Sequence, residues 1–157
     1  MKYVIATDHA GIETKNFTKE VLLSLGHEVI DLGPDSTERV DYPDFAEKLS
    51  QKVLEEAGEF DSKADWRETG VFGILICGTG IGMSITANKI RGIRASLCHD
   101  AYTSEMGRAH NNSNILCFGA RTTGFGTIES IVKTWDKTDF EGGRHLNRVL
   151  KIEALDK

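Results

Sequence analysis

An apolar run that ends in a cysteine and passes into a glycine-rich turn constrains the fold of this chain more than any other stretch. Residues 73–77 read Gly-Ile-Leu-Ile-Cys, glycine recurs at positions 78, 80 and 82, and a helical pattern follows from Ile85. Because a buried parallel strand has such an apolar run, we expect a strand, a tight turn and a helix N-terminus. The N–H groups of such a turn can hold an anion or a developing oxyanion, and they can lower the pKa of an adjacent thiol. We therefore predict an active site at residues 73–84.

Strand and helix patterns alternate along the rest of the 157 residues. Strand patterns lie at 3–7, 28–32, 73–77, 92–97 and 114–118, and the last helix follows the Glu-Gly-Gly at 141–143. This alternation predicts one α/β domain over residues 1–157, with a three-layer, doubly wound, Rossmann-like sheet of five parallel strands and a C-terminal helix. With the strand order 2-1-3-4-5, ligands bind where the order reverses, between the first and third strands. Asp8 and His9 are then expected to face Cys77 and Thr79 across one crevice.

Composition and charge exclude several classes of protein. The net charge of −5 gives no overall attraction to nucleic acid or to an acidic membrane surface. No apolar run approaches the ~20 residues of a membrane span, and the run that begins at Met1 is too short for a signal peptide. The three cysteines, at 77, 98 and 117, show no CxxC spacing. Neither a disulfide framework nor a zinc site is therefore expected, and the predicted location is cytoplasmic.

Cys77 is the main candidate for chemistry, although most cysteines that follow an apolar strand are structural thiols. The glycine turn favours a reactive role instead. A phosphatase loop with a thiolate nucleophile needs an arginine at the position of Met83, so a phosphatase is excluded. The glycine spacing does not match a dinucleotide-binding fingerprint either. The hydroxyl of Thr79 either shapes the turn or holds a substrate oxygen. For Cys98 and Cys117 a place in the core is the better interpretation.

Several polar residues outside the turn suit the recognition of a phosphorylated sugar. Asp8-His9 is either a simple turn or a catalytic or phosphate-contacting pair. His110 and Asn111 close a helix, where histidine is commonly a dipole partner but is also suited to opening a sugar ring. Arg144 and Arg148, four residues apart, share one helical face. Two guanidinium groups on one face suit a phosphate dianion, and the alternative is a solvated helix face.

Several of these stretches together carry a family resemblance that extends over nearly the whole chain. In chain order they are ATDHAG at 6–11, DYP at 41–43, CGTGIGMSITANK at 77–89, GIRA at 92–95, RAHN at 108–111, FGAR at 118–121 and EGGRHLNRV at 141–149. They resemble ribose-5-phosphate isomerase type B. That family shares its fold and chemistry with the subunits of galactose-6-phosphate isomerase and with allose-6-phosphate isomerase.

The resemblance implies an aldose–ketose isomerase of the pentose phosphate pathway that interconverts ribose 5-phosphate and ribulose 5-phosphate through an enediolate, without metal or cofactor. Cys77 is the implied base, Thr79 and the turn N–H groups the implied oxyanion donors, and His110 with Asp8 the implied ring-opening pair. The implied substrate contacts are Tyr42, Asn111 and the turn glycines Gly78, Gly80 and Gly82 at the sugar, with His9, Arg144, Arg148 and Arg121 at the phosphate.

Family members are dimers, often paired into tetramers, whose sites are completed by the partner chain. We therefore expect a homodimer or tetramer in which His110, Asn111 and some arginines enter the neighbour's site. One branch of the family uses a glutamate at the position of Met83, so the thiol branch fits this chain. Residues 58–70 form a longer stretch than is usual, and Asn112 stands where aspartate is common. The alternatives are a galactose or allose 6-phosphate isomerase and a non-catalytic phosphosugar-binding module.

Overall fold

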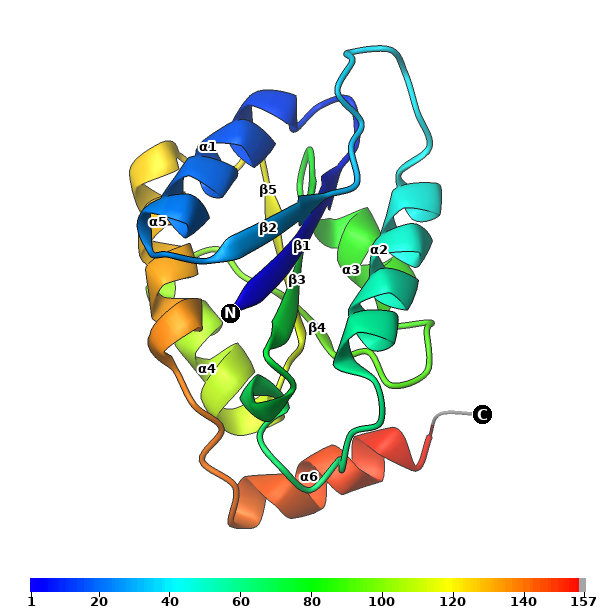
Figure 1. Cartoon of the computed structure of the whole chain (residues 1–157), viewed down its shortest axis with the longest axis vertical. Helices are drawn as coiled ribbons and strands as arrows, with labels where there is room; N and C mark the ends of the chain where they lie inside the picture. The colour runs from blue at the N-terminus through cyan, green and yellow to red at the C-terminus, as the bar shows by residue number, and fades with distance from the viewer. Residues whose placement is uncertain (156–157) are drawn as a thin grey trace.

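A parallel sheet between two layers of helices forms the centre of the computed structural model, which describes residues 1–155 (Figure 1). The strands are β1 (Lys2–Thr7), β2 (Glu28–Asp31), β3 (Val71–Cys77), β4 (Ala95–Leu97) and β5 (Ile115–Gly119). The helices are α1 (Ile12–Ser24), α2 (Tyr42–Ala57), α3 (Ile81–Ala87), α4 (Ala101–Asn111), α5 (Phe125–Lys137) and α6 (Arg144–Glu153), with a 3-10 turn η1 (Trp66–Thr69). Helices α1, α4 and α5 cover one face of the sheet, and α2 and α3 cover the other. The predicted doubly wound α/β fold with a C-terminal helix is confirmed.

The order of the strands is β2-β1-β3-β5-β4, and all pairs are parallel. The predicted order 2-1-3-4-5 is therefore wrong for the last two strands. All five residues of β5 are buried, so this strand lies inside the sheet between two neighbours. β4 has three residues, all partly exposed, and a short strand of this kind suits an edge. The reversal of strand order between β1 and β3, on which the predicted crevice depends, is confirmed.

Because the sheet is parallel, a helix that connects two strands runs back from the carboxyl end of one strand to the amino end of the next. Helix α4 runs back from the carboxyl end of β4, so its last residues reach the amino-terminal end of the strands. Helix α6 lies across that same end (Figure 1). The Glu141 N–H donates to the carbonyl of Ala109 at 3.0 Å, and the Arg94 guanidinium pairs with Glu153, so α6 is fixed to this end at both of its ends.

Residues 58–70, predicted to be a surface loop or a helix extension, form a loop that ends in η1 and places Trp66 in the core. Trp66 is 2% exposed, its indole N–H donates to the Val71 carbonyl at 2.7 Å, and its ring meets Phe60 edge to face at 4.8 Å. The stretch is therefore a packed part of the domain. Within residues 1–155, no helix has the length and apolar character needed to cross a membrane.

Candidate active site

The glycine turn after β3 holds the sulfur of Cys77 against a backbone donor. Gly80 has a left-handed φ of 77°, and its N–H donates to Cys77 Sγ at 3.1 Å. A Cβ at Gly80 would lie 2.8 Å from the backbone of Phe118 and 2.6 Å from a methyl group of Leu97, so only glycine fits this position. Cys77 is 5% exposed, and a backbone N–H at this distance suits an anionic sulfur.

Asp8 and His9 reach the same edge of the sheet from the neighbouring strand. Because Thr7 pairs with Ile76, Asp8, the first residue after β1, lies level with Cys77, the last residue of β3. Asp8 is buried, and its carboxylate accepts the N–H of Ala10 at 2.9 Å. The topology therefore places Asp8 and His9 beside Cys77 at the switch point, as the strand pattern predicted.

Tyr42 and Arg121 cover the two sides of the turn. A Cβ on Gly82 would lie 2.5 Å from Cζ of Tyr42, so the phenol ring rests directly on that glycine. The side chain of Arg121 lies over Gly78, where a Cβ would meet its Cδ and Nη1 at 3.6 Å. One chain thus gathers a carboxyl-edge cluster. Its members are Asp8, His9, Tyr42, Cys77, Gly78, Thr79, Gly80, Gly82 and Arg121.

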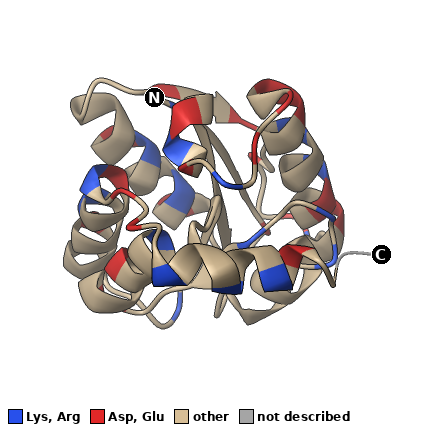
Figure 2. Ribbon diagram, turned by 90° about the horizontal axis from the view of Figure 1, so that it is seen from below, with Lys and Arg blue, Asp and Glu red and all other residues tan. Residues whose placement is uncertain are grey.

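The remaining candidate residues lie at the opposite end of the sheet. His110 and Asn111 end α4, and Arg144 and Arg148 lie on α6. Figure 2 views this end from below, with α6 in front and its lysine and arginine residues in blue. A single chain therefore does not bring these four residues to Cys77, and the candidates form two separate groups.

His110 belongs to a compact cluster at this second group. Its ring stacks on His145 with the centroids 4.0 Å apart and the planes at 8°. Glu141 Oε2 lies 3.7 Å from Nε2 of His110 and 3.3 Å from Nε2 of His145. Burial lowers the pKa of His145, and the nearby His110 and Arg144 act in the same direction against the opposing effect of Glu141. Neither Glu141 nor His145 was among the predicted site residues, although they stand four residues apart in the sequence.

Asn112 fixes the end of the helix that carries His110 and Asn111. Its φ of 48° is left-handed, its side-chain oxygen accepts the Trp66 N–H at 2.9 Å, and its amide nitrogen donates to the Ala64 carbonyl at 2.8 Å. An aspartate at this position has no donor for that carbonyl. The Asn112 side chain thus ties the end of α4 to Ala64 and Trp66 of the stretch 58–70.

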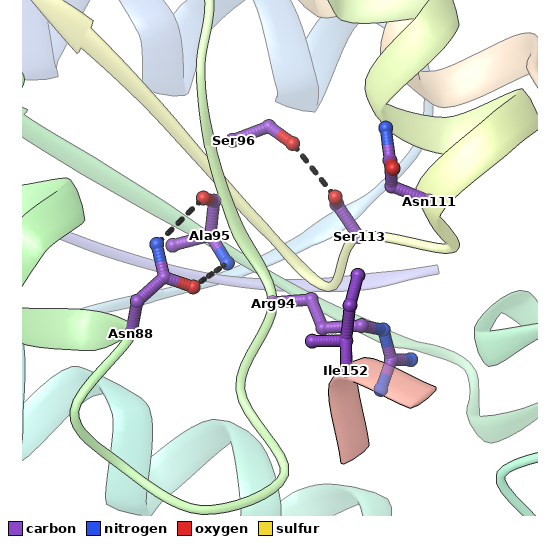
Figure 3. Close-up of a pocket in the computed structure, with 7 residues that line it drawn as sticks. All are labelled: Asn88, Arg94, Ala95, Ser96, Asn111, Ser113 and Ile152. Carbon is purple, nitrogen blue, oxygen red and sulfur yellow. Dashed lines mark hydrogen bonds between the residues drawn. The ribbon is translucent and has the colours of Figure 1, made fainter. Parts of the chain in front are cut away.

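A cavity of about 190 Å³ also lies near the end of α4 (Figure 3). It is lined by Asn88, Arg94, Ala95, Ser96, Asn111, Ser113 and Ile152. Its polar groups largely bind one another: the Asn88 amide forms two 2.9 Å hydrogen bonds with the backbone of Ala95, and the hydroxyls of Ser96 and Ser113 are 2.7 Å apart. Apart from Asn111 it contains no candidate residue, so it is distinct from the carboxyl-edge cluster.

Known proteins that are similar to this chain over nearly its full length are sugar-phosphate isomerases or are described as putative ones. The model of a family described as Ribose/Galactose Isomerase matches residues 3–152. Ribose-5-phosphate isomerase B of Escherichia coli (strain K12) is 41% identical, with 99% of this chain and 97% of that protein aligned. A putative sugar phosphate isomerase of Bacillus subtilis (strain 168) is 46% identical, with coverage of 100% and 98%. The solved structure of ribose-5-phosphate isomerase B from Clostridium thermocellum superimposes with a TM-score of 0.88 at 43% identity, covering 99% and 97% of the two chains.

Proposed function

Because this chain belongs to the ribose/galactose isomerase family, we propose that it interconverts ribose 5-phosphate and ribulose 5-phosphate, with Cys77 as the base. That the chain is a sugar-phosphate isomerase follows from the family. The observation that carries the finer proposal is the 3.1 Å contact between Cys77 Sγ and the Gly80 N–H at the switch point of the sheet. It supplies a thiol with a fixed donor at the place where ligands bind in such folds.

The proposed reaction is a proton transfer between adjacent carbons. The Cys77 thiolate removes the proton from C2 of the open-chain aldose, which leaves an enediolate with its charge on O1. After the O2 proton passes to O1, the resulting thiol returns a proton to C1, and O2 becomes the carbonyl oxygen of the ketose. Helix α3 begins at Ile81, and the first N–H to donate along it is that of Ser84, to the carbonyl of Gly80 at 3.0 Å. The N–H groups of Gly82 and Met83 are therefore outside the helix ladder, and with the Thr79 hydroxyl they can stabilise the enediolate oxygen.

We propose that the site is completed by a second copy of the chain in a homodimer or tetramer. The separation of the two groups supports this arrangement, because Arg144 and Arg148 are exposed at the end of the sheet far from Cys77. The partner's His110, with Asp8, then opens the sugar ring, and its Asn111 holds a hydroxyl. The phosphate lies between His9 and the partner's Arg144 and Arg148. No metal or cofactor has a part in this scheme.

We further propose a role in the pentose phosphate pathway in the cytoplasm. The three cysteines are all unpaired in the structure, which supports a reducing compartment. Burial raises the pKa of Cys98 to about 12 and raises that of Cys117 well above its ordinary range. These two thiols are therefore unreactive, in contrast to the role proposed for Cys77.

A comparison of two cysteine variants tests the reaction. Cys77→Ala is expected to lower kcat by roughly 10²- to 10⁴-fold, the usual contribution of a general base, while Cys98→Ala retains most turnover. Exchange of solvent deuterium into C2 of the sugar phosphate should disappear with Cys77→Ala. Near-normal kcat in that variant would remove Cys77 from the proposal.

A panel of substrates tests the sugar. The proposal expects the highest kcat/KM for ribose 5-phosphate, compared with allose 6-phosphate and galactose 6-phosphate. A higher value for either hexose phosphate would replace the pentose assignment. Tight binding of these sugars without any proton exchange would identify a phosphosugar-binding module.

A further inference from the structure

We infer that His110, Glu141 and His145 form a binding site for a transition-metal ion of the zinc class at the amino-terminal end of the sheet. One ligand atom from each of the three residues lies within 4.8 Å of the other two. The site is separate from the cysteines, and it uses imidazole and carboxylate ligands, so the cysteine spacing in the sequence gives no sign of it.

The distances within the cluster favour a shared ion over direct hydrogen bonds. Glu141 Oε2 is 3.3 Å and 3.7 Å from the two imidazole Nε2 atoms, which is longer than an ordinary N–H···O bond of about 2.7–3.2 Å. Ligands at about 2.0–2.1 Å from a tetrahedral zinc ion are separated by about 3.3 Å from one another. The two separations from Glu141 are therefore near those of a zinc site. The planes of the two stacked imidazoles lie at 8°, so their in-plane lone pairs do not converge. His110, whose side chain is 34% exposed, must therefore swing out of the stack and re-aim its Nε2 before both rings bind one ion.

The backbone conformation positions Glu141, and the burial of His145 holds its ring in place. Gly142 and Gly143 have positive φ values of 63° and 53°, and they form the turn that places Glu141 beside the first turn of α6. The His145 side chain is 5% exposed and is held between α6 and the stacked His110 ring. The His110 and Glu141 side chains are 34% and 57% exposed, so an ion can reach the site from solvent.

One neighbouring cation must move when the ion binds. Arg144 Nε donates to Nε2 of His145 at 3.4 Å, a long contact. Arg144 is an exposed residue at the first position of α6, so its side chain can turn into solvent. Two neutral imidazoles and one carboxylate favour Zn²⁺, Co²⁺ or Ni²⁺ over Mg²⁺ or Ca²⁺, which prefer oxygen ligands. Three protein ligands leave a fourth position for water.

Occupancy of this site has a consequence for the reaction that rests on the proposed function. The ion takes Nε2 of His110, the residue proposed to open the sugar ring. Zinc binding should therefore inhibit turnover reversibly. The binding itself depends on neither the substrate nor Cys77.

Titration with Co²⁺ tests the binding, because visible d–d absorption reports tetrahedral coordination without any measurement of activity. The full chain is used in a Cys77→Ser background, which removes the thiol as a competing ligand. We expect saturation at one Co²⁺ per chain. Glu141→Gln and His145→Asn should each weaken binding by at least roughly 10- to 100-fold, and His99→Ala, at an exposed histidine elsewhere, should leave it unchanged. Because Glu141 is exposed, Glu141→Gln tests the site even if His145→Asn does not fold. No Co²⁺ binding, or binding unaffected by Glu141→Gln, would overturn the inference.

A second experiment measures inhibition of turnover by Zn²⁺ in the natural chain, in which Cys77 is intact. Zn²⁺ should inhibit, a chelator should restore turnover, and Glu141→Gln should shift the inhibition to at least roughly tenfold higher Zn²⁺. Metal binding in a protein without isomerase activity would support the site and overturn the proposed function. Isomerase activity together with Co²⁺ binding that is unchanged in Glu141→Gln would support the proposed function and overturn the metal site.

Discussion

The side-chain oxygen of Asn112 accepts a hydrogen bond from the backbone N–H of Trp66 at 2.9 Å, and this bond joins the end of α4 to the stretch before β3. The amide nitrogen of the same side chain donates to the Ala64 carbonyl at 2.8 Å. The main-chain oxygen of Asn112 accepts two further bonds from the Arg94 guanidinium. The helix end that presents His110 and Asn111 is therefore held by the stretch 58–70 and by Arg94, the residue before β4.

Asn112→Asp is expected to lower the free energy of unfolding by about 1–3 kcal/mol. The substitution keeps the size and the acceptor but replaces the donor with an oxygen that faces the Ala64 carbonyl. Urea denaturation measures the change, and Asn111→Asp, at an exposed position one residue earlier, serves as the control. Equal stability of Asn112→Asp and the natural chain would show that the amide donor does not hold the stretch.

Asp65 makes stability depend on pH in the acid range. Its burial alone raises the pKa of the carboxyl, but the N–H groups of Arg67 and Phe140 and the charge of Arg108 lower that pKa overall. Because the folded pKa lies below the unfolded value of about 3.9, this stability is fully present above pH ~4 and is lost as pH falls through the folded pKa. Urea midpoints between pH 3 and 6 should therefore fall less steeply in Asp65→Asn than in the natural chain.

The control for this experiment is Asp61→Asn, which changes an exposed carboxylate of the same stretch. It should keep the acid dependence of the natural chain. At pH 7, Asp65→Asn should also be less stable, by about 3 kcal/mol, because it leaves the buried Arg108 without its carboxylate. A pH profile of Asp65→Asn parallel to that of the natural chain would contradict the assignment.

Local patterns in the sequence predict most of the fold, because the spacing of apolar residues distinguishes strands from helices and turn residues mark where each element ends. The apolar run before Cys77 and the glycines after it predict β3, the turn and α3. The order of β4 and β5 was not predictable in this way. Both segments read as strands, and the choice between them depends on which is longer and more completely buried in the folded sheet.

Of the candidate site, the sequence predicts the residues placed by strand ends and not those placed by contacts between distant parts of the chain. The rule that strand ends meet at a switch point brings Asp8 to Cys77 without any other information. The position of Asn112 depends on a contact with Trp66, 46 residues away, and no local pattern contains it. The roles of the candidate residues in catalysis remain predictions, which the following experiments test.

Gly82→Ala is expected to impair the substrate site without unfolding the protein. The new methyl group would lie 2.5 Å from the Tyr42 ring, which must move, while alanine favours the helix by up to about 1 kcal/mol. We expect KM for ribose 5-phosphate to rise several-fold and the melting temperature to stay unchanged or rise. Gly126→Ala in α5, where a Cβ meets no atom within 4 Å, is the matched control and should alter KM little.

Arg148→Ala should weaken the binding of phosphorylated sugars selectively. The loss of a charge-assisted hydrogen bond of about 1.5–3 kcal/mol corresponds to a rise in KM of roughly 10- to 100-fold for ribose 5-phosphate. The free sugar ribose lacks the phosphate, so its kcat/KM should change little. Lys151→Ala, at an exposed position on the same helix, controls for the loss of a positive charge. Equal losses for both sugars would show that Arg148 does not bind the phosphate.

Hybrid dimers test whether Cys77 and His110 act in one site from different chains. A Cys77→Ala chain and a His110→Ala chain, each nearly inactive alone, are given different tags, and the hybrid is isolated by two affinity steps. If the sites are shared, one of the two sites in the hybrid has both residues, so activity should be about half that of the natural dimer. The reciprocal hybrid pairs a natural chain with a Cys77→Ala/His110→Ala chain. Shared sites leave it nearly inactive, because each site then lacks one residue, whereas sites built within one chain would leave it about half active. With shared sites the first hybrid is half active and the second nearly inactive, and with sites built within one chain the reverse holds. Loss of folding in a variant chain would not produce this difference between the two hybrids.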